Sequence, residues 1–100
     1  MNEGILGQPV YKEEDILSLE YGKWRRVKEE IDFGSGSVAE LWNYDKRKPV
    51  EKMVIKPGEE IQNMGEGPKD IITIQVWNHG VGRRHYFIPK SRLEGVKVKL

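Results

Sequence analysis

One stretch of this 100-residue chain, VWNHGVGRRHYFIP at positions 76–89, concentrates side chains that could bind a ligand or transfer protons. Its aromatic rings could stack on nucleobases or sugars, and its two arginines could neutralise phosphate groups. Its two histidines, His79 and His85, titrate near neutral pH and are therefore candidates for acid–base catalysis. However, they lie six residues apart across a glycine loop, and no third group is fixed beside them. The spacing favours binding over catalysis.

No motif elsewhere in the sequence specifies a catalytic, metal or nucleotide site. The chain has no cysteine, which excludes thiolate zinc ligands and disulfide bonds. The glycine-rich segments GSGS (34–37) and GVG (80–82) lack the Lys-Ser/Thr pair and the following helix of a phosphate loop, so we interpret them as hairpin turns. We therefore expect no cofactor, no metal and no catalytic residue. A small nuclease or hydrolase and a carbohydrate binder are the less favoured classes.

Charge is distributed unevenly along the chain, although the net charge is only +1. Residues 1–22 hold five acids against one lysine, whereas residues 77–100 hold six basic residues against one acid. This asymmetry has two interpretations, which the sequence leaves open. Either the basic C-terminal quarter faces an anionic partner, or it pairs internally with the acidic N-terminal segment.

The segments around the glycine loop predict a β-hairpin with two different faces. DIITIQVW (70–77) is rich in β-branched residues, and RRHYFI (83–88) returns after a loop at residues 78–82. A loop of this length places Trp77 opposite Arg83, and side chains alternate between faces along each strand. The core face then carries Ile72, Ile74, Val76, Tyr86 and Ile88, with Arg84 at its rim. The outer face carries Thr73, Gln75, Trp77, Arg83, His85 and Phe87.

The remaining elements predict a single, mainly β domain, a small antiparallel barrel or sandwich of about five to six strands with one or two short helices. In residues 24–33, Val27, Ile31 and Phe33 alternate with charged residues, as on a half-buried strand, and a short loop would place Ala39 and Leu41 on the same face as Ile31 and Phe33. Further strands are expected in 38–45, 50–55 and 95–100. We expect an irregular arm in 1–12, a short helix in 13–22, a turn in KRKP (46–49) and an irregular segment in 57–69.

The outer face of the hairpin is the predicted binding surface. Trp77, His85 and Phe87 would stack on or hydrogen-bond to a ligand, while Arg83, Arg84 and Lys90 would neutralise phosphates. The surface could extend to Trp24, Arg26, Trp42, Lys46, Arg47 and Lys48 if those segments share the face.

We predict that this face makes the protein a non-enzymatic nucleic-acid-binding domain, more specifically one for single-stranded DNA or RNA. The alternative is a protein–protein interaction module, or a structural subunit of a homo-oligomer or larger assembly, because interface centres also use aromatic residues and arginine. A third interpretation has Trp77 and Phe87 covering a smaller core beneath the N-terminal arm.

The N-terminal residues lack the basic and apolar regions of a secretory signal, and no apolar stretch approaches the roughly 18 residues of a membrane span. We therefore expect a cytoplasmic protein without a membrane partner. One third of the residues are charged, a proportion reminiscent of thermophile proteins.

Overall fold

The computed structural model describes residues 12–34, 39–42, 46–50 and 52–100, so residues 1–11 of the arm predicted at 1–12 lie outside these ranges. A four-residue α-helix, α1 (Lys90–Leu93), and 3-10 turns at Ile16–Ser18 and Pro68–Asp70 are the helical elements of these ranges. The strands described are β1 (Glu13–Asp15), β2 (Arg25–Arg26), β3 (Ile31–Gly34), β4 (Ala39–Trp42), β5 (Lys46–Pro49), β6 (Met53–Ile55), β7 (Glu60–Glu66), β8 (Ile71–Asn78), β9 (Gly82–Pro89) and β10 (Lys97–Lys99).

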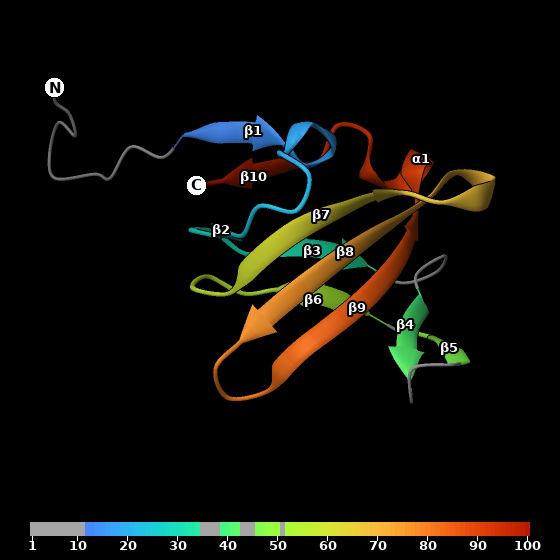
Figure 1. Ribbon diagram of the computed structural model, residues 1–100. Helices are drawn as coiled ribbons and strands as arrows, with labels where there is room; N and C mark the ends of the chain where they lie inside the picture. The colour runs from blue at the N-terminus through green and yellow to red at the C-terminus, as the bar shows by residue number, and fades with distance from the viewer. Residues whose placement is uncertain (1–11, 35–38, 43–45, 51) are drawn as a thin grey trace, which may run out of the picture.

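The strands form one large antiparallel sheet and two small ones. The large sheet has the order β2-β7-β8-β9-β4-β5, and β3–β6 and β1–β10 are two-stranded ribbons. The mainly β class is confirmed, but the described strands form open sheets rather than a closed barrel. In the large sheet, β8 and β9 form the longest hairpin, and its turn lies at the opposite end from α1 (Figure 1).

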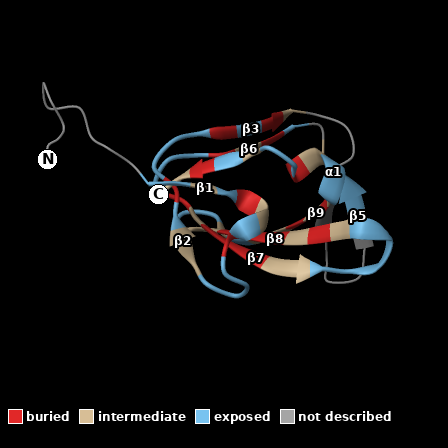
Figure 2. Ribbon diagram, turned by 90° about the horizontal axis from the view of Figure 1, so that it is seen from above, coloured by how far each residue is buried: buried red, intermediate tan, exposed pale blue. Residues whose placement is uncertain are grey.

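The core lies between the large sheet and the β3–β6 ribbon. Figure 2 shows β3 and β6 on one side of the molecule and β7 and β8 on the other. Ile74, Val76 and Ile88 of the hairpin are completely buried, and each such side chain contributes about 1.5–3 kcal/mol to the free energy of unfolding. The cluster is completed by Ile16, Leu19, Val27, Ile31, Phe33, Met53, Ile55, Ile61, Ile72, Tyr86, Leu93 and Val98.

The predicted hairpin register is confirmed. Trp77 is opposite Arg83, Val76 is opposite Arg84 and Gln75 is opposite His85. The strand predictions for 50–55 and 95–100 are also confirmed, by β6 and β10. GVKVKL (95–100) alternates apolar and polar residues, and VEKMVI (50–55) ends in an apolar run with β-branched residues, and both patterns are typical of strands.

The predicted helix at 13–22 is wrong, because its first residues form β1 instead. Glu13 and Asp15 lie in register with Lys99 and Lys97 of β10, and their carboxylates approach the lysine Nζ atoms at 2.8 and 2.6 Å. A helix as short as this one would gain little from its own hydrogen bonds, whereas the strand pairing aligns opposite charges across β1 and β10. Two lysines of the basic C-terminal quarter are thus paired with the acidic N-terminal segment.

The prediction of an irregular segment at 57–69 is also wrong, because these residues contain β7, a strand in the interior of the large sheet. The sequence EIQNMGE has few β-branched residues and therefore a weak strand signal. It is held by pairing on both sides, with β2 through Arg25–Ile61 and with β8 through Ile61–Val76. The tertiary context outweighs the local propensity.

Three smaller predictions are wrong for the same reason: the local sequence pattern does not specify which strands pair with each other. The expected strand at 24–33 is interrupted between β2 and β3. KRKP is not a turn but β5 at the sheet edge, where lysine and proline are tolerated. β3 pairs with β6, and β4 pairs with β5 and β9, so Ala39 and Leu41 do not join β3 in one hairpin.

Candidate functional site

The turn between β8 and β9 has a defined geometry. The Val81 N–H donates to the Asn78 carbonyl at 3.1 Å, and the Asn78 side chain accepts a hydrogen bond from the Gly80 N–H at 2.8 Å. Gly82 follows with φ of +96°, a conformation that side chains other than glycine rarely adopt. The hydrogen bond between Asn78 and Val81 closes a four-residue β-turn, and Gly82 pairs with Asn78 directly after it. The glycines therefore shape the turn, as the sequence indicated.

Beside this turn, the outer face of the sheet carries a hollow of about 380 Å³. It is lined by Trp24, Glu60, Trp77 and Arg83. Glu60, Trp77 and Arg83 are neighbours in one row across β7, β8 and β9, because Glu60 pairs with Trp77 and Trp77 pairs with Arg83. Trp24 comes from the segment just before β2. We refer to these four residues as the tryptophan hollow.

Two residues of the tryptophan hollow, Arg83 and Trp77, each lie against a neighbouring aromatic ring. The Arg83 guanidinium carbon lies 5.6 Å from the centroid of the Trp24 ring, within the range of a cation–π interaction. Trp77 meets the His79 ring edge-on at 5.9 Å between centroids. Arg83 is exposed, and within the described ranges no carboxylate lies at ion-pair distance from it. Arg83 is therefore available to an anionic ligand.

Arg84 lies on the other face of the hairpin and makes a structural ion pair. Its Nη2 is 2.6 Å from Oε2 of Glu59, whose side chain is only 5% exposed. The same oxygen accepts a hydrogen bond from Asn78 at 2.8 Å, and Arg84 Nη1 donates to the Tyr86 hydroxyl at 3.2 Å. This position does not favour the predicted role of Arg84 in neutralising phosphate, because the guanidinium is already paired with Glu59. Arg84 instead anchors the turn from the core side.

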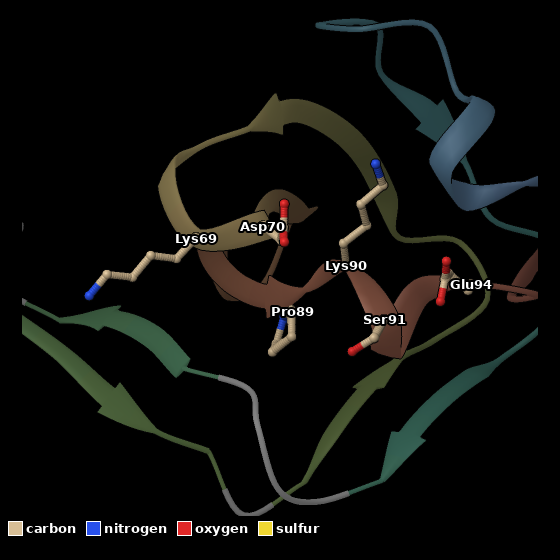
Figure 3. Close-up of a pocket in the computed structure, with 6 residues that line it drawn as sticks. All are labelled: Lys69, Asp70, Pro89, Lys90, Ser91 and Glu94. Carbon is tan, nitrogen blue, oxygen red and sulfur yellow. The ribbon is translucent and has the colours of Figure 1, made fainter.

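Lys90 is at the opposite end of the hairpin, beside a second hollow of about 480 Å³. Lys69, Asp70, Pro89, Lys90, Ser91 and Glu94 line it (Figure 3). The side chains of Lys69 and Lys90 point in different directions, and Lys90 Nζ is 3.2 Å from Oε1 of Glu66. The structure therefore does not bring Lys90 together with the tryptophan hollow, and the diverging side chains do not converge on one ligand.

Of the basic residues predicted on β2 and β5, Arg26 lies in the same row as Arg83, whereas Lys48 does not. Arg26 is next to Glu60 in the same row, with 3.7 Å between Nη2 and the carboxylate, so it borders the tryptophan hollow. Lys48 is exposed, but it does not belong to the row of Arg83. It pairs with Glu40, and Glu40 pairs with Tyr86, which is a residue of the core face. The side chains of Trp42, Lys46 and Arg47 lie outside the described part of the structure.

His85 and Phe87 continue the outer face away from the turn, and both are half-buried. Gln75, opposite His85, is buried and accepts a hydrogen bond from Gln62 at 3.0 Å. Burial of the imidazole lowers the pKa of His85 below its usual value, and the positive charge of Arg83 lowers it further. His85 is thus disfavoured as a cation and is suited to accept or donate a hydrogen bond as a neutral ring.

We expect His85 to make the fold less stable at acidic pH. Its pKa in the folded protein is lower than the usual 6.5, so the unfolded chain binds the proton more tightly. Its contribution is favourable above pH 6.5 and is lost as the pH falls through the lower folded pKa. Urea unfolding at several pH values should show a smaller loss of stability for His85→Gln than for the wild type. Equal losses in both proteins would contradict this.

Sequence reasoning missed Glu59 and Glu60, because it did not predict β7. The signal was the Pro57–Gly58 turn followed by two glutamates, since consecutive residues at a strand start face opposite sides. Glu59 accordingly serves the core side and Glu60 the outer side. A strand predicted directly after this turn would have placed Glu59 and Glu60 on opposite faces of the sheet.

Comparison with protein-family models, with curated proteins and with solved structures finds no match to this chain. Within the ranges that the structure describes, no group of three or more His, Cys, Asp or Glu side chains is placed to hold a metal ion. No helix in those ranges has the length and apolar character that a membrane crossing requires.

Proposed function

We propose that this protein binds single-stranded nucleic acid through the tryptophan hollow. The observation that supports this most strongly is the grouping of Trp24, Trp77 and Arg83 around one depression of an open sheet face, with no carboxylate of the described residues paired to Arg83. Tryptophan rings give a base a stacking surface worth about 1–3 kcal/mol, and a guanidinium can contact the adjoining phosphate.

A single strand fits this site better than a duplex. The stacking surfaces of the hollow belong to Trp24 and Trp77, near the base of a tight turn. A base can enter it only when its faces are free, which is the case in single strands but not within a stacked duplex. Among the described residues, Arg83 is the basic residue that lines the hollow and Arg26 borders it, which favours one or two phosphate contacts rather than a long electrostatic track.

A protein partner is the second candidate, and Glu60 is the observation that favours it. The carboxylate repels phosphate but attracts a lysine or arginine of another chain. Arg26 lies 3.7 Å from it and offsets part of this repulsion. If the hollow serves self-association, light scattering after size exclusion should give a mass above that of the 11.6 kDa monomer.

The test of nucleic-acid binding is a titration of intrinsic tryptophan fluorescence with an unstructured oligonucleotide. We expect quenching, and we expect the affinity to fall about 2.6-fold per contacted phosphate when salt is raised fourfold, from about 50 to about 200 mM. Quenching follows from stacking on Trp24 or Trp77, and the salt dependence follows from counterion release. Absence of quenching at the lower salt concentration, or an affinity independent of salt, would overturn the proposal.

A further inference from the structure

Glu60 is the residue of the tryptophan hollow that simple stacking does not explain. Its side chain is 31% exposed, and its nearest cation, Arg26 Nη2, lies 3.7 Å away, beyond hydrogen-bond distance. No described residue donates a hydrogen bond to either carboxylate oxygen. An ionised carboxylate has about four acceptor positions, so Glu60 presents unused acceptor capacity to anything that enters between the rings.

The position of Glu60 relative to the rings determines which edge of a base it would meet. It is the direct cross-strand neighbour of Trp77, and Arg83 is the next residue in the same row. A base stacked on Trp77 would therefore turn one edge toward the carboxylate and leave its sugar and phosphate toward Arg83. Charge supports this direction, because the phosphate is drawn to the guanidinium and repelled by Glu60.

Base edges differ in what they offer a carboxylate. Guanine presents two adjacent donors on its Watson–Crick edge, the N1–H and the N2 amino group, which match two carboxylate oxygens. Adenine and cytosine each present an amino group next to a ring nitrogen acceptor, which repels the second oxygen. Uracil and thymine present one N–H between two carbonyl acceptors. Guanine alone allows a paired, charge-assisted contact.

We propose that the tryptophan hollow is selective for guanine, with Glu60 accepting hydrogen bonds from the N1–H and N2 amino groups. This inference rests on the proposed binding of single-stranded nucleic acid. In it, Trp24 and Trp77 supply stacking that any base can use, and Glu60 supplies the discrimination. Arg26 lies 3.7 Å from the carboxylate and attracts it electrostatically without occupying its acceptor positions.

The test compares four oligothymidine hexamers that carry guanosine, inosine, adenosine or thymidine at one central position. We expect the guanosine hexamer to bind about tenfold or more tightly than the adenosine and thymidine hexamers, as one charge-assisted contact implies. Inosine, which lacks the N2 amino group, should fall between them. This arm uses the unaltered protein, so it does not depend on the folding of any variant.

Glu60→Gln should remove the preference for guanosine while the thymidine hexamer still binds. The matched control is Glu66→Gln, on the same strand but paired with Lys90 outside the hollow, which should keep the preference. Equal affinity of all four hexamers for the wild type would overturn the selectivity and leave the proposed function standing. A guanosine preference retained in Glu60→Gln would overturn the role of Glu60. No binding of any hexamer at low salt would overturn the proposed function itself.

Discussion

Replacement of Glu59 by glutamine is expected to lower the free energy of unfolding by about 3 kcal/mol, because it breaks a buried ion pair by removing one partner. The Glu59 carboxylate accepts hydrogen bonds from the backbone N–H of Lys56 at 2.8 Å, from Asn78 at 2.8 Å and from Arg84 at 2.6 Å. A neutral amide cannot satisfy these three donors and would place its own N–H₂ group against one of them. Arg84, with a side chain only 21% exposed, would keep its charge without a counter-ion.

Urea unfolding measures this effect, and a double-mutant cycle assigns it to the pair. Arg84→Met should destabilise the fold by a similar amount, and the double variant should be less destabilised than the sum of the two single variants. Glu13→Gln is the control, since its ion pair with Lys99 is at the exposed surface and should leave the unfolding midpoint nearly unchanged. If Glu59→Gln behaves like this control, Glu59 is not the anchor of the turn.

Glu59 also links stability to the candidate site. It lies in the turn that leads into β7, and it contacts Asn78 at the start of the hairpin turn. Its neighbour Glu60 lines the tryptophan hollow on the opposite face. The buried network on the core side therefore fixes the two strand ends from which Glu60, Trp77 and Arg83 extend.

The hairpin could be predicted from the sequence because its information is local. Ile72, Ile74 and Val76 alternate with polar residues, and the odd-length loop then determines the faces of both strands. The register of Trp77 with Arg83 followed from that pattern alone, and the structure has it. The same pattern separated Arg84 from Arg83, although it could not show that Arg84 had a partner.

Long-range pairing could not be predicted from local patterns. β7 is a strand because β2 and β8 pair with it on either side, and its buried polar residues, Gln62 and Asn63, are satisfied by side-chain hydrogen bonds to Gln75 and to the Ile16 carbonyl. Such residues read as a loop in isolation, because polar side chains are rarely buried without a partner. For this reason Glu60, to which we assign the proposed selectivity, was absent from the predicted site.

Replacement of Trp77 by alanine is expected to weaken binding of a single-stranded oligonucleotide by about 5- to 150-fold, equivalent to the 1–3 kcal/mol of stacking on one aromatic ring. Trp77 is half-buried and forms a wall of the hollow between Glu60 and Arg83. Its removal takes away the stacking surface and the edge contact with His79. Anisotropy of a labelled oligonucleotide measures the loss without depending on tryptophan emission.

Two controls separate the loss of stacking from a general effect on the fold. Trp77→Phe keeps a smaller ring and should retain part of the affinity, whereas a merely structural role would predict equal binding once both variants are shown to be folded. Tyr21→Ala removes a ring that is 68% exposed and lies beside Gly65, away from the hollow, so it should bind as the wild type does. If Trp77→Ala also binds as tightly as the wild type, nucleic acid does not use this hollow.

If Tyr21→Ala instead loses as much affinity as Trp77→Ala, then the ligand contacts a different aromatic surface, because Tyr21 shares a separate hollow with Leu17 and Leu19.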